Sequence, residues 1–238
     1  MERKTSESAQ GIVEYGLIVV LVLLAVLLIL SAMGVSLRVA YCQVVTGLGF
    51  ETSYCESAYC ADLFDEGLNG WAIPANGGWE VRDGQLCSNA NGWNNYAYNA
   101  CSYQKPPSDY IITIDVATLF QGDGYGVFFR LQDYSDNKPS GYAFQYDPGA
   151  GGAFVVRKWV NGYEINPPIV RKVMPRYGWY NQPRSIRIRA QGDTFTAFVD
   201  DEEVFSFTDS TYPEGGAGLR YWHNSRVCLD DFSILPLN

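Results

Sequence analysis

The hydrophobic and polar positions of the chain follow one pattern up to about residue 46 and a different pattern after residue 60. From Gln10 to Leu37 most positions are apolar, and no charged residue lies between Tyr15 and Leu37. At about 1.5 Å per residue, such a run forms a helix long enough to cross a hydrocarbon core of roughly 30 Å. We expect helical character to continue to about Val45, because a Gly-Leu-Gly triplet follows it.

From Ala61 onward, short stretches of alternating apolar and polar residues are separated by tight-turn sequences. Asp109–Ala117 and Ser185–Ala190 alternate most clearly, and the dipeptides Asp83-Gly84 and Asn161-Gly162 are typical of β-hairpin turns. Roughly a dozen short strands without a helical period predict a two-layer antiparallel β-sandwich. The expected fold class is therefore α+β, with a long N-terminal α-helix followed by an antiparallel β-sandwich.

These patterns divide the chain into four segments. We expect a leader at residues 1–9, a hydrophobic helix at 10–46, a cysteine-containing connector at 47–60 and a β-sandwich domain at 61–238. The leader carries Arg3 and Lys4 before the apolar run, which predicts a cytoplasmic N-terminus and an exported C-terminus. An ordinary secretory signal peptide is the alternative, although its apolar region is usually only about 7–15 residues long.

Composition and charge add constraints on the partners. Aromatic residues make up 15% of the chain and charged residues only 18%, which is more typical of strands than of helices. The formal net charge is −9. An acidic surface disfavours nucleic acid and electrostatic docking onto anionic lipid, so we expect no nucleic-acid partner.

All cysteines follow the apolar run, at Cys42, Cys55, Cys60, Cys87, Cys101 and Cys228. An even number on one side of a membrane segment predicts disulfide bonds in an oxidising, exported compartment. No spacing is a CxxC pair, which disfavours a zinc site. We expect Cys42 to pair with Cys55 or Cys60, Cys87 with Cys101, and Cys228 with the remaining connector cysteine. Many other pairings stay open.

One carboxylate, Glu14, lies at the front of the apolar run, where a charge is costly unless a partner neutralises it. The stretch Ala9–Ile18, AQGIVEYGLI, resembles the class III prepilins of the Flp/Tad (tight adherence) type, and the resemblance covers about the first 45 residues. It implies cleavage by a prepilin peptidase between Ala9 and Gln10 and a processed or methylated N-terminus. The family usually has Gly before the cut, so cleavage after Gly11 is the alternative.

The same resemblance implies that Glu14 and Tyr15 act in the assembly of a type IV pilus of the Tad type. Cleavage creates an α-amino group, with which Glu14 of a neighbouring subunit can pair. Breaking a buried ion pair costs about 3–5 kcal/mol, so such a pair can set the register of subunits. The alternative is a solvated glutamate at the membrane interface.

The implied partners are copies of the chain in a helical filament, the prepilin peptidase, the pilus assembly machinery and, before assembly, the inner membrane. The implied location is the cell membrane for the precursor and then an extracellular pilus, or fimbrium.

The order of the later segments resembles the concanavalin-like, or laminin-G-like, jelly rolls. The stretches that carry this resemblance are Leu63–Gly67 with Gly70-Trp71, Trp79–Leu86, Gly126–Arg130, Ile186–Ile188, Phe198–Asp200 and Leu229–Phe232. In such folds the first and last strands pair, so Phe64 and Phe232 are expected to be neighbours in the core.

This second resemblance suggests two kinds of ligand. Asp65, Glu66 and Asp231 could supply oxygen ligands for a structural calcium ion near the paired terminal strands, and exposed carboxylates at turns are the alternative. Sandwich lectins stack aromatic side chains on sugar rings. The candidate contacts to a surface glycan are Trp93, Tyr96, Trp179 and Tyr180, and the alternative is that they pack between subunits or into the core.

The sequence contains no recognisable catalytic constellation. His223 is the single histidine, and no serine stands in a nucleophile-elbow motif. The closely spaced Glu-x-Asp-x-Glu pattern of concanavalin-like glycosidases is absent, and the run Asp200–Glu203 is interpreted as a solvated hairpin tip. We therefore predict a non-enzymatic structural pilin that displays a β-sandwich for adhesion or glycan contact. The alternative is a membrane-anchored, lectin-like surface protein that binds carbohydrate and does not polymerise.

Overall fold

The computed structural model describes residues 17, 19–22, 58–74, 78–104, 106–132 and 137–237. The chain forms two compact units, Met1–Glu56 and Ser57–Asn238. In the first unit residues 17 and 19–22 are helical, and the rest of the expected N-terminal helix lies outside the described residues. The same is true of Ala9, Gln10, Glu14, Tyr15, Cys42 and Cys55. Within the described ranges, no helix is both long enough and apolar enough to cross a membrane.

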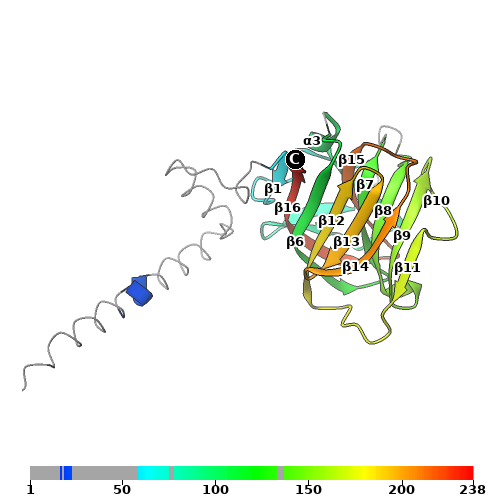
Figure 1. Ribbon diagram of the computed structural model, residues 1–238. Coiled ribbons are helices and arrows are strands. Elements are labelled where there is room, and N and C mark those ends of the chain that lie inside the picture. Colours follow the sequence, from blue (N-terminus) through cyan, green and yellow to red (C-terminus); the bar gives the residue numbers. More distant parts are fainter. Residues whose placement is uncertain are drawn as a thin grey trace, which may run out of the picture. The chain divides into compact units, whose positions relative to one another are not determined.

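The second unit is an antiparallel β-sandwich of two sheets (Figure 1). In the first sheet the strand order is β14-β13-β12-β6-β16-β4-β3, and β1 pairs with β16 beside β4. The bounds of its strands are β1 Cys60–Asp62, β3 Trp79–Arg82, β4 Gln85–Ser88, β6 Tyr110–Gln121, β12 Pro183–Gln191, β13 Thr194–Val199, β14 Glu202–Thr208 and β16 Arg226–Pro236.

The second sheet has the order β10-β9-β8-β7-β15-β5-β2, and β11 also pairs with β9. Its strands are β2 Trp71–Ala72, β5 Asn94–Asn99, β7 Tyr125–Leu131, β8 Gly141–Asp147, β9 Ala153–Val160, β10 Tyr163–Glu164, β11 Val170–Val173 and β15 Gly216–Trp222. Strands that are neighbours in space are often distant in sequence, because the chain crosses between the two sheets several times.

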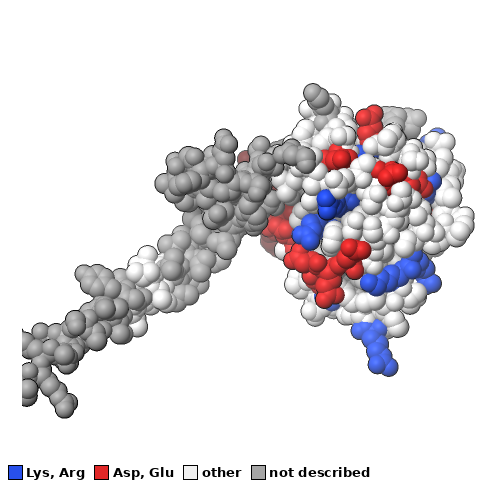
Figure 2. Space-filling view, viewed as in Figure 1, with Lys and Arg blue, Asp and Glu red and all other residues white. Residues whose placement is uncertain are grey.

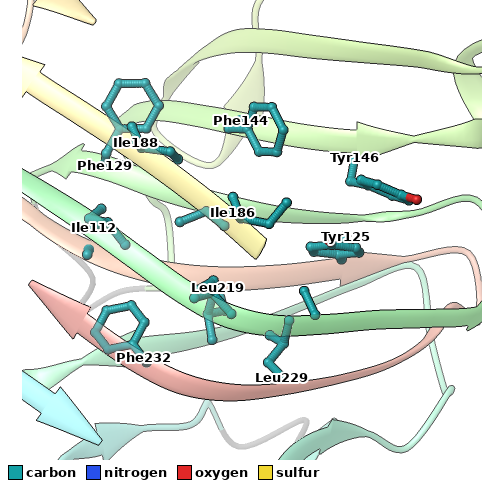
Figure 3. Packing of buried hydrophobic residues seen from close by; sticks show 14 of the residues in the cluster. Ile112, Tyr125, Phe129, Phe144, Tyr146, Ile186, Ile188, Leu219, Leu229 and Phe232 are labelled. Atoms are coloured by element: carbon teal, nitrogen blue, oxygen red, sulfur yellow. The ribbon is translucent and has the colours of Figure 1, made fainter. Parts of the chain in front are cut away.

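The core lies between the sheets and is built from the inward-facing half of each strand. Figure 3 shows apolar side chains packed between the ribbons of the two sheets, and those it labels are at most 1% exposed. They are Ile112, Ile186, Ile188, Leu229 and Phe232 from the first sheet, and Tyr125, Phe129, Phe144, Tyr146 and Leu219 from the second. Full burial of one such side chain contributes about 1.5–3 kcal/mol, so this layer is the main source of stability.

Two-residue turns fix the register of several hairpins. Asp83 and Gly84 have φ of 52° and 73° between β3 and β4, and Asn161 and Gly162 have φ of 50° and 84° between β9 and β10. Left-handed backbone at both positions matches the right-handed twist of the flanking strands. Both hairpins predicted from these dipeptides are therefore confirmed.

A third turn of this kind lies in the acidic run. Asp200 and Asp201 are the left-handed residues, with φ of 52° and 63°, whereas Glu202 already belongs to β14. The two aspartates pair with arginines of β12, Arg184 at 2.6 Å and Arg187 at 2.9 Å. Figure 2 shows the sandwich from the side of the first sheet, where acidic and basic side chains form separate small groups on a largely uncharged surface.

The first and last strands pair as expected, with Asp62 opposite Phe232. Phe64 and Phe232 are both buried, and the indole of Trp71 contacts both rings at centroid distances of 5.7 Å and 5.0 Å. The Trp71 Nε1 group donates to Asp62 Oδ2 at 2.6 Å. Trp71 therefore links the two phenylalanines across the closure of the sandwich.

The disulfide pairing differs from the expected one. Cys60 is bonded to Cys101, and Cys87 is bonded to Cys228. The predictions of Cys87 with Cys101, of Cys228 with a connector cysteine and of Cys42 with Cys60 are therefore wrong. Cys228 stands directly opposite Cys87 in the β16–β4 ladder, so strand pairing decides this bond. A bond between Cys42 and Cys55 would lie outside the described residues.

The sandwich also contains a short α-helix that the strand pattern did not predict. Helix α3 spans Ala100–Gln104, directly after β5. The side chain of Asn99 accepts from the Ser102 amide at 3.0 Å, and the Ser102 hydroxyl donates to the Asn99 carbonyl at 2.7 Å. The turn is thus held by local polar contacts and by the bond of Cys101 to Cys60, which leave no periodic signal in so short a segment.

Candidate functional site

A hollow of about 460 Å³ lies on the outer face of the second sheet. Its strand residues, among them Gln145, Arg157 and Arg220, alternate with residues of the core between the sheets, so they point away from that core. The side chains and turns around it are Trp93, Asn94, Asp123, Gln145, Asp147, Gly149, Ala150, Arg157, Trp159, Gly162, Tyr163, Glu164, Arg220, Trp222 and His223. The volume is in the range of small-molecule sites, about 300–1,000 Å³.

Beside the hollow, a second apolar cluster covers the same outer face. It contains Tyr96, Tyr98, Phe128, Leu131, Ala143 and Trp159 from strands β5, β7, β8 and β9. Phe128 and Trp159 meet edge to face, with ring centroids 5.4 Å apart. Trp159 belongs both to this cluster and to the lining of the hollow, so the packed side chains form one wall of the hollow.

Strand register places the polar groups in a row across the sheet. Arg220 of β15 is opposite Gly126 of β7, which is opposite Gln145 of β8. A Cβ atom at Gly126 would lie 2.8 Å from the Phe144 carbonyl oxygen and 3.1 Å from Arg220 Cγ. Glycine at this position therefore lets the Arg220 side chain lie flat against β7 as it extends into the hollow.

Glu164 is the centre of the hydrogen-bond network in the hollow. Its Oε1 atom accepts from Gln145 Nε2 at 2.6 Å and from Arg220 Nη1, while Oε2 lies 3.5 Å from Arg157 Nε. The Arg220 Nη2 group also donates to Asn94 Oδ1 at 2.6 Å. Strands β5, β8, β9, β10 and β15 thus meet through one connected set of charged and amide groups.

The guanidinium of Arg220 is held between two aromatic rings. Its Cζ atom lies 4.4 Å from the ring centroid of Trp159 and 4.4 Å from that of Trp222. The side chain is 3% exposed, and burial lowers the pKa of Arg220 while Glu164 opposes that change. Cation–π contact and the carboxylate together offset only part of the cost of burying the charge.

The rim of the hollow carries exposed aromatic rings. Trp93, just before β5, and Tyr163, just after the β9–β10 turn, are each 75% exposed. Trp93 meets the His223 ring edge to face at 4.4 Å, and His223 Nδ1 is hydrogen-bonded to Asp123 Oδ2. Large apolar faces left open beside a polar floor are typical of a surface that a ligand covers.

Asp147, at the end of β8, is the buried acid of the hollow. It is 7% exposed, and its Oδ1 atom caps the short 3₁₀ turn Pro148–Ala150 by accepting from the Ala150 amide at 2.8 Å. Burial raises the pKa of Asp147 to about 6, and the Ala150 hydrogen bond opposes this rise. The group therefore changes protonation at mildly acidic pH.

Of the four aromatic residues predicted to contact a glycan, only Trp93 lines the hollow. Tyr96 is buried in the apolar cluster beside it. Trp179 packs into the core at ring distances of 4.8 Å from Tyr146 and 5.0 Å from Phe154, which is the alternative given above. Tyr180 is exposed elsewhere, and its hydroxyl donates to the Gly122 carbonyl at 2.9 Å.

The three carboxylates proposed as calcium ligands do not form one group. Asp65 and Glu66 line a second hollow of about 340 Å³ beside Asp62, and Asp231 is not among its lining residues. Asp62 already accepts from the Phe64 amide and from Trp71 Nε1. In the part of the chain that the structure describes, no cluster of three or more His, Cys, Asp or Glu side chains is arranged to hold a metal ion.

The sequence interpretation missed the strand residues of the hollow, namely Gln145, Arg157, Glu164 and Arg220. A signal for them exists. Arg220 lies in GAGLRYW and Gln145 in GYAFQYD, which are strands otherwise made of apolar and small residues. A polar residue inside a strand buried along its whole length needs a partner, so such positions point to a buried network.

Comparison with known proteins shows the family and the fold of the domain. A family model described as "3-keto-alpha-glucoside-1,2-lyase-like domain" matches residues 60–234. Carbohydrate-binding module CBM66 from Bacillus subtilis is similar in structure, with a TM-score of 0.58 and 22% identity over 70% of this chain and 95% of that one. No curated protein matches the chain.

Lectin domains share the fold as well. The exoplasmic/lumenal domain of VIP36, in a form bound to Ca²⁺ and Man3GlcNAc, has a TM-score of 0.59 and 11% identity over 76% of this chain and 89% of that one. The carbohydrate recognition domain of Emp47p has a TM-score of 0.53 and 13% identity over 71% of this chain and 89% of that one. The predicted jelly-roll sandwich is thereby confirmed for the second unit.

Proposed function

This chain belongs to the 3-keto-alpha-glucoside-1,2-lyase-like domain family, and we propose that its β-sandwich binds carbohydrate in the hollow on the second sheet. The proposal rests on the combination of hydrogen-bonded polar side chains in the hollow with exposed aromatic rings at its rim. Gln145 and Arg220 both donate to Glu164, whereas Trp93 and Tyr163 at the rim are each 75% exposed.

This arrangement matches the chemistry of a sugar. A pyranose or furanose ring offers patches of C–H groups that pack on aromatic faces, and a set of hydroxyls that donate and accept hydrogen bonds. Sites of this type place a few fixed polar groups among apolar walls, so that the polar groups set orientation and the walls supply contact area. The carbohydrate-binding module and the lectins named above support the proposal through their shared fold.

A glycan-binding assay with the full chain tests the proposal. The purified protein in mild detergent is applied to a glycan array, and hits are measured by titration calorimetry. Trp93→Ala should weaken binding by about two- to twelvefold, since a stacked aromatic contact contributes about 0.5–1.5 kcal/mol. Phe120→Ala is the control, because Phe120 is an exposed aromatic residue on the first sheet. Absence of any hit, or equal losses in both variants, would contradict the proposal.

A second candidate function is catalysis, which the family description suggests and one observation favours. Asp147, with a pKa of about 6, is a buried acid in the same hollow as Arg157 and Arg220. A carboxylate of this kind can take a proton, and arginines can stabilise a developing oxyanion. Incubation with 3-keto-glucosides, followed by detection of released sugar, tests this candidate. Release that is lost in Asp147→Asn while binding persists would favour catalysis over binding alone.

For the N-terminal segment we propose the role that the sequence predicts, a pilin helix that assembles into an extracellular pilus after membrane insertion and cleavage at Ala9/Gln10. The support is the Glu14-Tyr15 pair in front of the long apolar run. The glycan-binding sandwich would then be displayed on the filament. Sequencing the mature N-terminus tests this proposal: Gln10 supports it, whereas a start near residues 33–37 contradicts it.

Glu14→Ala separates a filament subunit from a permanently anchored surface lectin. If Glu14 pairs with the amine of a neighbouring subunit, its loss should abolish filaments while the protein still inserts into the membrane. Electron microscopy of the cell surface and immunoblotting of membranes measure the two outcomes. Filaments of normal number in the variant would favour the anchored lectin.

A structural calcium ion beside Asp65 and Glu66 is also a proposal. It is supported by the second hollow and by the Ca²⁺-bound forms of VIP36, which share the fold. Thermal unfolding with added CaCl₂ or EGTA tests it. A melting temperature that is equal under both conditions would contradict it.

A further inference from the structure

The carboxylates that line the hollow are not equally paired with arginines. Two guanidinium groups, Arg157 and Arg220, face three carboxylates, Asp123, Asp147 and Glu164. Both arginines form their ion pair with the same carboxylate, that of Glu164. The distribution of charge around a bound ligand therefore depends on this one glutamate.

Each arginine donates to two protein acceptors, and the buried Arg220 Nε group has no hydrogen-bond partner among the residues that the structure describes. Arg220 donates through Nη1 to Glu164 and through Nη2 to Asn94, and its side chain is 3% exposed between two indole rings. Arg157 donates through Nε to Gln145 at 3.3 Å and through Nη1 to Asn166. An anionic ligand would therefore compete with the Glu164 carboxylate, and with the amide oxygens of Asn94, Gln145 and Asn166, for these two guanidinium groups.

The remaining carboxylates add negative potential. Asp147 accepts from the backbone amide of Ala150, and Asp123 is hydrogen-bonded to the His223 ring. Neither contact is with an arginine. A ligand carboxylate or sulfate would approach these groups in a partly desolvated hollow, where a like-charge approach costs about a hundredfold in affinity, or about 2.7 kcal/mol.

We infer that Glu164 sets the charge selectivity of the hollow, so that it takes uncharged sugar residues and excludes uronic acids and sulfated sugars. The inference rests on the proposed carbohydrate binding and adds the class of sugar. An uncharged hydroxyl can donate to the free lone pairs of Asp147 or Glu164 without disturbing the arginines. Glu164 thus acts as a specificity-determining residue from the β9–β10 hairpin, next to exposed Tyr163.

The test compares matched sugars. Titration calorimetry on the full chain uses the methyl glycosides of glucose, galactose, mannose and fructose, together with methyl glucuronide, galacturonide and mannuronide. Among the glucose, galactose and mannose glycosides, the one that binds most tightly is compared with its own uronide. The ratio of the two affinities for the wild-type chain should be at least about ten, a difference of about 1.4 kcal/mol. This ratio is measured without any variant, so it stays decisive even if a substitution affects folding.

Glu164→Gln removes the charge and keeps an oxygen that can accept from Gln145 and Arg220. Because one arginine charge is then uncompensated, the ratio of hexoside affinity to uronide affinity should fall by about tenfold or more in the variant. Glu80→Gln is the matched control, because Glu80 also pairs with an arginine, Arg82 at 3.0 Å, but lies outside the lining of the hollow. The control should leave the ratio unchanged, and circular dichroism compares the folding of all three proteins.

The outcomes separate the two proposals. If hexosides bind but uronides bind equally well or better, or if Glu164→Gln and Glu80→Gln shift the ratio equally, the charge-selectivity inference is overturned and carbohydrate binding stands. If no glycoside of either panel binds, carbohydrate binding in this hollow fails and the inference fails with it. A hexoside preference that Glu164→Gln alone reduces supports both.

Discussion

Asp147→Asn measures how much stability the domain loses by keeping a buried carboxyl in its hollow. The side chain is 7% exposed, and burial raises its pKa from 3.8 to about 6. Because the folded chain holds this proton more tightly than the unfolded chain does, Asp147 contributes stability that is fully present below about pH 3.8. That contribution is lost as the pH rises through about 6.

The size of the effect follows from the two pKa values. One pKa unit corresponds to about 1.4 kcal/mol, so the ionised carboxylate should lower the free energy of unfolding by about 3 kcal/mol above pH 7. Asparagine carries no charge at any of these pH values, and its Oδ1 atom can still accept from the Ala150 amide. The variant should therefore match the wild type near pH 3 and exceed its stability by up to about 3 kcal/mol near pH 7.5.

Urea unfolding of the full chain in mild detergent, followed by tryptophan fluorescence at both pH values, measures this difference. Other carboxyl groups also titrate in this range, so the informative quantity is variant minus wild type at each pH. Asp83→Asn controls for the loss of one negative charge, since Asp83 is exposed in the β3–β4 turn. An Asp147→Asn difference of the same size at both pH values would refute the argument that burial penalises the charge.

Three further predictions concern packing and cross-linking. Trp179→Ala should lower the free energy of unfolding in urea by about 3–5 kcal/mol, because its ring is 8% exposed in the core. Gly126→Ala should abolish glycan binding in calorimetry by displacing Arg220, whereas Gly178→Ala, with no protein atom closer than 3.5 Å, should not. Replacing Cys87 and Cys228 together by alanine should cost about 2–5 kcal/mol in urea unfolding, and peptide mapping by mass spectrometry should recover their cross-link in the wild type.

A stabilising Asp147→Asn substitution would also bear on function. A residue that reduces stability in the native state is usually retained for another reason, and Asp147 lines the same hollow as Glu164 and Trp93. If the variant gains stability and loses glycan affinity, the cost of burying the carboxylate is linked to ligand binding.

Local sequence predicted the elements that depend on local physics. The Asp83-Gly84 and Asn161-Gly162 turns need left-handed backbone at both positions, and these residue types adopt it readily, so the hairpins could be located from the sequence. Alternation in Ser185–Ala190 likewise predicted a strand with one buried face, and β12 spans Pro183–Gln191. Helix α3 was not predictable in this way, because five residues are too few to show a period.

The candidate site was predictable only in part, for a different reason. Trp93 was proposed as a glycan contact because its stretch is loop-like, aromatic and rich in amide side chains. Trp179 stands in a stretch of the same kind but lies in the core. Arg220 contacts Glu164, 56 residues away, and Asn94, 126 residues away. No pattern along the chain states which distant strands become neighbours.

Apolar runs, alternation and backbone preference were enough to predict the two-part organisation of the chain, the antiparallel sandwich and its tight turns. The Cys87–Cys228 and Cys60–Cys101 bonds, and the grouping of Glu164, Gln145, Arg157 and Arg220 around one hollow, became known only from the folded chain. They depend on the register between strands. Antiparallel pairing places Cys228 opposite Cys87 and Arg220 opposite Gly126, and these partners are fixed only when both sheets close on their common core.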